Sequence, residues 1–288
     1  MPRIHILPGT YEGRKFDVNG ATLEVKPYTI PHESTVDADR RGTPLPDQST
    51  WWHVTNGVFA GYWVRETSSV YESFTPLKHM RILAGTHTGY RFDPNGTVTN
   101  KNERSISKDS GADLRGRMQL RGQPYWLVDE GIWEDFWVPE SAVAYERFDA
   151  PVSVFFRQGP HTGHQFDAKG TSVKRHDQTL STDSSTSASG RVDIDGTTYW
   201  LIDRGGFANM WVPSSARVYQ ILQPQGFVSF GAGPHTGFKF AANGSVESQV
   251  NRTLTTDSNA PAKGRTTIDG RVFYLMATGV FAEYWVQE

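Results

Sequence analysis

Hydrophobic and polar residues alternate in short runs that are separated by turns containing glycine. The clearest example covers residues 191–202, where the alternation continues on both sides of Asp195-Gly196. An Asp-Gly pair between alternating runs is typical of a β-hairpin. Two further copies of this hairpin are predicted at Arg121-Gly122 and Asp269-Gly270. No segment has a helical apolar period longer than about two turns, so the chain is predicted to be all-β.

Other short runs add strands and turns to this pattern. Residues 152–156 are β-branched and aromatic, which predicts a strand. Residues 165–173 predict two strands across an Asp-x-x-Gly turn, in which glycine takes a positive φ. The same turn is expected after Phe16, Phe92 and Phe240, although the last copy has Ala241 in place of aspartate. We interpret the aspartates Asp17, Asp93 and Asp167 as turn formers and not as calcium ligands.

The pattern repeats along the whole chain. Residues 57–64 recur at 131–138, 205–212 and 279–286, and each stretch ends in Trp-Val. The tryptophans of these pairs stand 74 residues apart, at Trp63, Trp137, Trp211 and Trp285. A second signature, Gly-x-His/Tyr-x-Gly, begins at residues 9, 85, 159 and 233. Such self-similarity predicts one structural unit copied four times, and we place copies 1 to 4 at 1–71, 72–145, 146–219 and 220–288.

The segments between copies also recur. A tyrosine follows each of the first three repeated tryptophans by eight residues, at Tyr71, Tyr145 and Tyr219. A proline comes a few residues later, at Pro76, Pro151 and Pro224, and we expect it to stiffen a linker. The sequence stops two residues past Val286, so the fourth closing tyrosine is expected to be missing or supplied otherwise.

Composition and charge restrict the function classes. The length of 288 residues would suggest two domains, but the fourfold repeat takes precedence, and 28 Gly, 16 Pro and 12% aromatic residues are typical of a turn-rich globular protein. The net charge is −2, and copies 1 to 4 contribute −1, −1, 0 and 0, so nucleic acid is not an expected partner. No apolar run is long enough to span a membrane. Without cysteine there are no disulfides, no thiol chemistry and no Cys-based zinc sites.

The order of features in one copy resembles the bacterial SH3-like family, which includes the GW modules that attach proteins to the cell wall. In copy 3 these features are the run 199–202, Gly205, Trp211-Val212, the polar turn 213–216 and Val218-Tyr219. The resemblance implies four tandem small SH3-like β-barrel modules of about 74 residues each. It departs from the family in two ways. The residue before the repeated tryptophan is never glycine, and the Gly-x-His-x-Gly segment has no counterpart.

The resemblance implies a binding function. Tandem modules would attach to a cell-wall or surface glycan, such as peptidoglycan or teichoic acid, and hold a fused or associated enzyme there. Four tethered copies on a repetitive polymer gain ~10²–10⁴ in avidity. We expect a monomer that is extracellular or bound to the cell wall, although residues 1–7 carry no signal peptide. The first alternative is a scaffold that binds another polypeptide, and the second is a glycan-cleaving enzyme of an unfamiliar type.

Catalysis is not expected. The sequence has no nucleophile elbow, no His-Glu-x-x-His and no phosphate-binding glycine loop. A zinc site is not expected either, because the close pair His161 and His164 occurs in copy 3 alone. No cofactor is predicted. The unusual residues 133–135 in copy 2 and 51–53 in copy 1 are interpreted as differences that tune ligand preference.

Two repeated positions are candidate ligand contacts. The first is an aromatic residue in each glycine-led loop: Phe59, Trp133, Phe207 and Phe281. These rings could stack on sugars at a barrel rim or fold back to fill the barrel end. The second is the polar aromatic residue of the Gly-x-His/Tyr-x-Gly signature: Tyr11, His87, His161 and His235. These side chains could bond sugar hydroxyls or cap a turn by bonding backbone.

Overall fold

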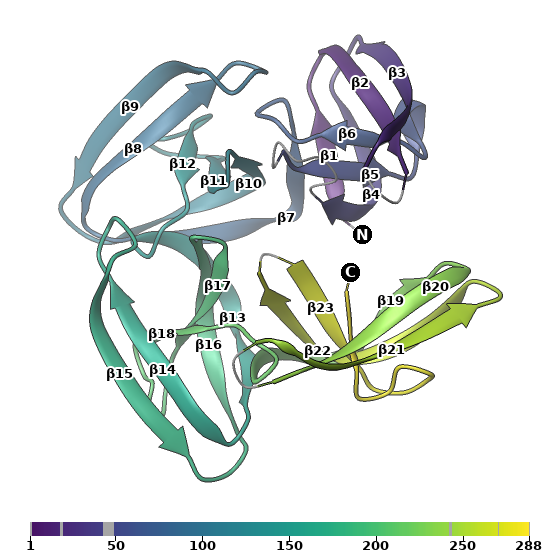
Figure 1. The fold of residues 1–288 in the computed structure, drawn as a ribbon. Coiled ribbons are helices and arrows are strands. Elements are labelled where there is room, and N and C mark those ends of the chain that lie inside the picture. Colours follow the sequence, from purple (N-terminus) through teal and green to yellow (C-terminus); the bar gives the residue numbers. More distant parts are fainter. Residues whose placement is uncertain (1, 18–19, 43–48, 242–243, 270, 288) are drawn as a thin grey trace. The chain divides into compact units, whose positions relative to one another are not determined.

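The computed structural model describes residues 2–17, 20–42, 49–241, 244–269 and 271–287. Within these ranges the chain forms 24 β-strands and one short 3₁₀ helix, with no α-helix (Figure 1). Neighbouring strands pair in antiparallel fashion, as in Arg3↔Ser73 and Gly159↔Leu180. The all-β prediction is therefore confirmed. No helix in the described part is long and apolar enough to cross a membrane.

The chain divides into two compact units, 1–146 and 147–288. The elements of unit 1 are β1 (Arg3–Ile6), β2 (Gly9–Phe16), β3 (Thr22–Ile30), β4 (Ser34–Gly42), β5 (Trp51–Val54), η1 (Gly57–Phe59), β6 (Trp63–Arg65), β7 (Val70–Ile82), β8 (Gly85–Phe92), β9 (Val98–Ile106), β10 (Ser110–Leu120), β11 (Gln123–Val128) and β12 (Trp137–Pro139).

The strand β13 (Ala144–Phe156) continues into unit 2. The remaining elements are β14 (Gly159–Phe166), β15 (Ser172–Leu180), β16 (Ser184–Ile194), β17 (Thr197–Ile202), β18 (Met210–Pro213), β19 (Val218–Phe230), β20 (Gly233–Phe240), β21 (Val246–Leu254), β22 (Ser258–Ile268), β23 (Arg271–Met276) and β24 (Trp285–Gln287).

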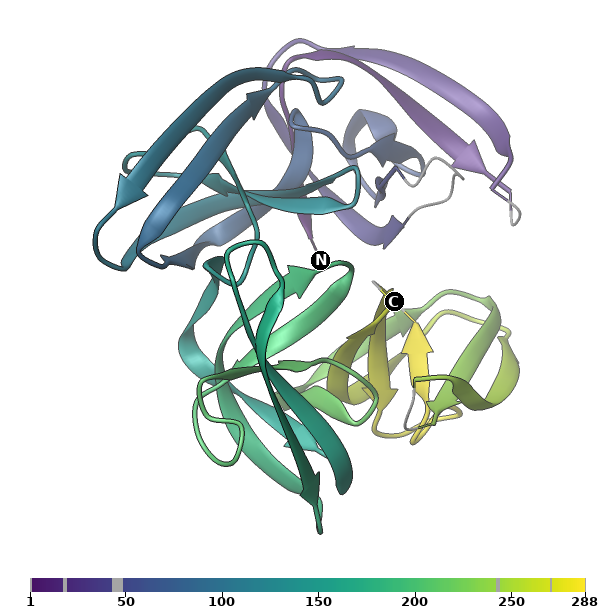
Figure 2. The ribbon, with the colours of Figure 1, turned by 60° about the vertical axis from the view of Figure 1, so that its left-hand side comes forward.

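The predicted two-residue hairpins are present. Asp195-Gly196 joins β16 to β17 with φ values of 49° and 76°, and Arg121-Gly122 joins β10 to β11 with 53° and 82°. Two consecutive positive φ values match the right-handed twist of the flanking strands. In the fourth copy, Ile268 pairs with Arg271 around Asp269, while Gly270 lies outside the described residues. Each copy also has a longer hairpin, of which β2–β3 is a curved two-stranded ribbon (Figure 2).

The aspartate turns behave as the sequence predicts. The Asp93 Oδ1 atom accepts the backbone N–H groups of Asn95 at 2.9 Å and Thr97 at 2.8 Å, and Asp167 makes the same pair of bonds. Ala241 cannot make them. Its turn keeps the bond from the Gly244 N–H to the Ala241 carbonyl, at 3.0 Å.

Four buried clusters of apolar side chains follow the predicted copies. They are centred on Trp52, on Trp126, on Trp200 and on Met276, and each draws its buried residues from one of the four predicted ranges. The SH3-like barrel form of each copy, and the boundaries at 71/72, 145/146 and 219/220, remain predictions.

The prediction that these prolines stiffen linkers between copies is wrong. Pro76, Pro151 and Pro224 lie inside the long strands β7, β13 and β19. In β7, the ladder to β10 jumps from Lys78 opposite Leu114 to Ser73 opposite Gly116. Pro76 falls inside this irregular stretch, where a residue without an N–H is tolerated. One strand therefore passes from the first copy into the second without a flexible connection.

Candidate binding cleft

The four loop aromatics predicted to contact ligand are buried. Phe59, Trp133, Phe207 and Phe281 expose 1%, 2%, 4% and 2% of their surface. Each ring lies against the second glycine of the Gly-x-His/Tyr-x-Gly segment. A Cβ at Gly13 would stand 2.7 Å from the Phe59 ring. These rings fill the interior, so the stacking hypothesis is not supported by their placement.

The polar aromatic residues of the same segment hold the backbone. The Tyr11 hydroxyl donates to the Leu7 carbonyl at 2.8 Å, and the Nε2 atoms of three histidines lie 2.5–2.8 Å from the carbonyl four residues earlier. These histidines are His87, His161 and His235. Since the carbonyl only accepts, Nε2 must carry the proton. Burial lowers the pKa of His161, partly opposed by its bond to the Arg157 carbonyl. All four side chains therefore bond backbone, as the turn-capping alternative predicts.

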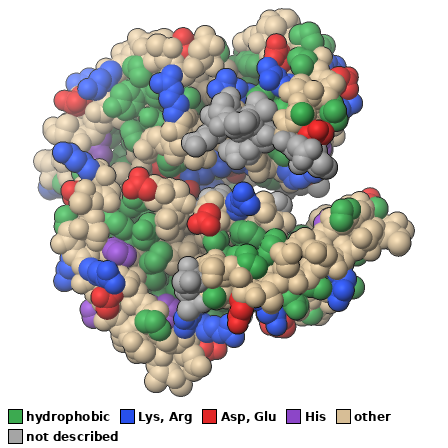
Figure 3. Space-filling model, in the orientation of Figure 1, with side chains coloured by type: hydrophobic (Ala, Val, Ile, Leu, Met, Phe, Trp, Pro, Cys, Tyr) green, Lys and Arg blue, Asp and Glu red, His purple; other side chains and the backbone are tan. Residues whose placement is uncertain are grey.

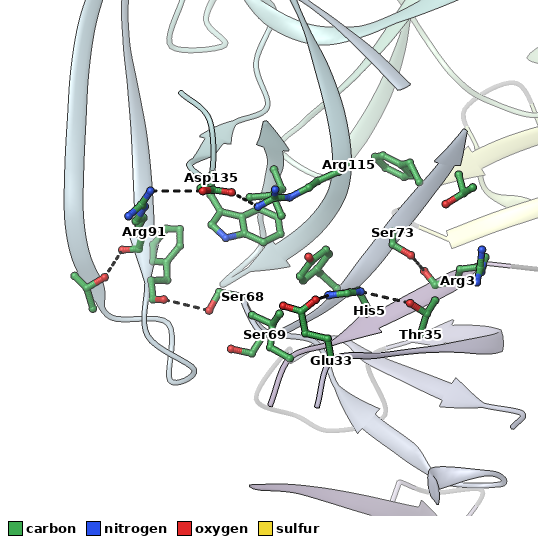
Figure 4. Close-up of a pocket in the computed structure, with 18 residues that line it drawn as sticks. Arg3, His5, Glu33, Thr35, Ser68, Ser69, Ser73, Arg91, Arg115 and Asp135 are labelled. Carbon is green, nitrogen blue, oxygen red and sulfur yellow. Dashed lines mark hydrogen bonds and ion pairs between the residues drawn. The ribbon is translucent and has the colours of Figure 1, made fainter. Parts of the chain in front are cut away.

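A cleft of about 700 Å³ lies elsewhere, between the first two copies within unit 1 (Figure 4). Its lining combines aromatic, charged and hydroxyl side chains: Arg3, His5, Leu7, Glu33, Thr35, Ser68, Ser69, Tyr71, Ser73, Phe74, Thr75, Arg91, Phe92, Thr99, Arg115, Leu127, Asp135 and Trp137. Copy 1 supplies the residues from β1 to the start of β7, and copy 2 supplies the rest.

The floor of the cleft is an aromatic contact between the two copies. The Tyr71 ring from β7 meets the Trp137 ring from β12 edge to face, with centroids 5.2 Å apart, and both residues are buried. Met118 and Leu127 complete this cluster. Burial raises the pKa of the Tyr71 phenol. The tyrosine that closes copy 1 in the sequence thus packs into copy 2.

One side of the rim carries linked charges. Asp135 has a left-handed backbone, with φ of 62°, that turns its carboxylate toward Arg115. The two side chains form an ion pair, and Arg91 lies 3.9 Å from the second carboxylate oxygen (Figure 4). Arg115 also reaches Asp129 at 3.8 Å. These groups are one-third to one-half exposed, so a ligand can compete for the guanidinium groups.

The opposite side of the rim centres on His5. Its Nε2 lies 3.6 Å from Glu33, and its Nδ1 lies 3.4 Å from the Thr35 hydroxyl. Burial lowers the pKa of His5, although the nearby Glu33 carboxylate raises it in part. The Ser73 hydroxyl donates to the Arg3 carbonyl at 3.2 Å. This side therefore offers hydroxyl, imidazole and carboxylate groups.

The cleft is suited to holding a polar ligand over an apolar floor. Its volume falls in the range of small-molecule sites, roughly 300–1,000 Å³. Both rim carboxylates lie beside a cationic or imidazole partner, so the rim presents paired charges to a ligand. The described residues contain no cluster of three metal-ligating side chains. Charges of both signs are scattered over the visible face of the molecule (Figure 3).

The cleft was not predictable from local sequence patterns. Its parts come from eight separate stretches of chain, and no local motif joins them. The eight-residue spacing from each tryptophan to its tyrosine is the available signal, because it recurs in the first three copies. The contact across copies cannot be deduced from that spacing.

Comparisons with known proteins add little. No family model and no curated protein matches the sequence. A solved structure that aligns with the chain is that of a provisionally assigned autolysin from Listeria monocytogenes, with 11% identity and a TM-score of 0.21. The alignment covers 77% of this chain and 97% of the other. This likeness is too low to support an argument about fold or function.

Proposed function

We propose that this chain is a non-catalytic binding protein that attaches through SH3-like modules to a bacterial cell-wall or surface glycan. The observation that carries the proposal is the unit-1 cleft, with its aromatic floor and its rim of hydroxyl and charged groups. We place the protein outside the cell or at the cell wall, where such a polymer is available. An enzyme held at the same polymer is the expected associate.

The chemistry of the cleft supports a saccharide ligand. A sugar ring has apolar C–H faces and a polar edge of hydroxyls. The small exposed parts of Tyr71 and Trp137, with the partly exposed Phe92 ring packed against them, form the apolar floor. Thr35 and Thr99 bring hydroxyls to exposed positions on the rim. Arg3, Arg91 and Arg115 line the cleft and can donate to sugar oxygens or to an acidic substituent, since guanidinium groups offer several N–H donors in one plane.

The repeated architecture supports a polymer over a free sugar. A shallow and open site gives weak binding by itself. Several tethered sites on a repetitive chain raise the overall affinity by ~10²–10⁴ through effective concentration. Polymer binding gives four similar copies in one chain a physical purpose.

Retention on purified peptidoglycan sacculi, with and without wall teichoic acids, tests the proposal. The full chain should be retained. An R3A/R91A variant should be retained about tenfold less, because a lost bond to a charged group costs roughly 1.5 kcal/mol or more. The matched control is K174A/R175A on the exposed strand β15, which should bind as the unmodified chain does.

The outcomes separate the proposal from its rival. Equal retention of R3A/R91A and K174A/R175A would remove the cleft from the binding site. Absence of retention on either wall preparation would refute the glycan proposal. Capture of a protein partner by the full chain would then favour the polypeptide scaffold.

A further inference from the structure

We infer that unit 2 carries a second ligand site, built from copies 3 and 4 in the same way that copies 1 and 2 build the cleft of unit 1. This inference rests on the proposed function for the class of its ligand. The site itself is assigned from the internal geometry of unit 2. We call its residues the unit-2 cluster: Phe155, Tyr219, Lys239, Lys263, Leu275, Glu283 and Trp285.

The floor of the cluster repeats the floor of the cleft. The Tyr219 and Trp285 rings meet edge to face with centroids 5.1 Å apart and planes at 80°, against 5.2 Å and 83° for Tyr71 and Trp137. Leu275 packs beside them as part of the same buried group. Each of these residues stands 148 positions after its counterpart in unit 1.

The backbone that carries this floor is also repeated. Gly264 pairs with Ile221 in unit 2, as Gly116 pairs with Ser73 in unit 1. A Cβ at Gly264 would lie 2.8 Å from the Tyr219 ring. The tyrosine therefore lies directly on the facing strand in both units, and the strand register next to it is the same.

The charged rim is rebuilt with different residue types. Lys263 and Glu283 form an ion pair, as Arg115 and Asp135 do in unit 1. Glu283 has a left-handed backbone with φ of 64°. The sequence offset is again 148 residues for both partners, so the acidic residue is presented by the same loop in the same conformation.

The second cation of the rim matches as well. The Lys239 ammonium lies 4.9 Å from the Tyr284 ring centroid, and the Arg91 guanidinium lies 4.6 Å from the Phe136 ring centroid. Copy 3 has the uncharged residues Gln165, Ser189 and Asn209 at the positions of these two cations and the acid. The charged triad is therefore a property of copies 2 and 4.

The differences indicate a different preference for the same class of ligand. Phe155 takes the place of His5 beside the partly buried Tyr219, with ring centroids 4.9 Å apart. This makes the wall more apolar, and burial raises the pKa of Tyr219 to about 12. Lysine ammonium groups act as point charges and lack the planar fork of arginine. We therefore expect the unit-2 site to hold saccharides that present more C–H surface and fewer planar acidic groups.

Retention of the full chain on purified sacculi tests this inference with variants in each unit. The sacculi should retain only part of the R3A/R91A variant and only part of the K239A/K263A variant. Each variant should bind with an affinity about tenfold below that of the unmodified chain. The combination of all four changes should abolish retention. K239R/K263R, which installs the cations used in unit 1, should retain binding. Circular dichroism and the thermal midpoint check that every variant folds.

The possible results distinguish the two proposals. If K239A/K263A binds like the unmodified chain while R3A/R91A does not, the unit-2 site is refuted and the proposed function stands. If the unmodified chain does not bind sacculi, both are refuted. Loss of binding in K239A/K263A that K239R/K263R restores, while all variants keep the thermal midpoint of the unmodified chain, would support the second site, because a loss of structure is then excluded as the cause.

Discussion

Replacement of Gly116 by alanine tests the contact on which the cleft depends. Gly116 lies in β10, where the Tyr71 ring covers it. An added Cβ would stand 2.6 Å from the ring Cδ2 and 2.8 Å from the Glu72 carbonyl oxygen. The first distance is about 0.8 Å inside the 3.4 Å at which ordinary contacts begin. Trp137 packs against the ring on another side and opposes its displacement, and the Glu72 carbonyl belongs to the backbone of the facing strand.

The expected cost follows from this overlap. Forcing an extra methyl group into a packed interior costs about 1–3 kcal/mol. Unit 1 spans residues 1–146, and for a unit of this size each kcal/mol lowers the thermal midpoint by about 2–4 °C. We therefore expect Gly116→Ala to lower the midpoint of the unit-1 transition by about 2–12 °C.

Differential scanning calorimetry is the assay, and the same strand supplies the control. A Cβ at Gly111 would have its nearest neighbour, the Met80 carbonyl oxygen, at 3.4 Å. Gly111→Ala should leave the midpoint unchanged or raise it slightly, because alanine restricts the unfolded chain. Gly264→Ala should reproduce the loss in unit 2. Equal midpoints for Gly116→Ala and Gly111→Ala would refute the close packing of Tyr71.

Three further predictions address charge and protonation. Glu66 is buried and accepts bonds from the Arg41 guanidinium at 3.0 and 3.1 Å and from the Gln119 N–H at 2.9 Å. Glu66→Ala should therefore lower the free energy of unfolding by about 3 kcal/mol, as measured by denaturant titration. Burial lowers the pKa of His161. The contribution of His161 to stability should therefore be complete above the ordinary histidine pKa and should decrease as the pH falls through that value toward the lowered pKa. His161→Gln should reduce this decrease in thermal midpoints measured between about pH 8 and pH 5. The pKa of Tyr219 is raised to about 12, so this phenol should add a late step to the alkaline absorbance titration, and Tyr219→Phe should remove that step. The contribution of the protonated phenol to stability is present below about pH 10 and is lost as the pH rises through about 12.

Local structure is predictable from the sequence, while the wider contacts are not. The Asp195-Gly196 hairpin and the Asp93 turn follow from backbone preferences within a few residues, and both are present. Tyr71 and the glycine it covers are 45 residues apart, and nothing in either local pattern identifies the other as its partner. The strand across Pro76 escapes prediction because its ladder is interrupted at the proline and resumes on both sides.

The burial of the loop aromatics has a signal in the same repeats. A glycine recurs at Gly13, Gly89, Gly163 and Gly237, and an aromatic residue follows 46 residues later in the first copy and 44 residues later in the other three. A small residue that recurs opposite a large one indicates that the two pack together. The hypothesis that these rings stack on sugars considers only the loop that carries each ring. It interprets the glycine against which the ring packs only as part of a turn.

The continuous strand β7 has a mechanical consequence for a protein that is pulled along its length. Residues 70–73 of β7 pair with β1, and residues 72–73 and 78–82 pair with β10, so tension entering one copy passes to the next along an extended backbone. There is no slack loop to lengthen first. For the antiparallel ladders on either side, load along the strand acts in shear on several hydrogen bonds at once, and does not open them one by one. Unit 1 should therefore resist extension as a single stiff element.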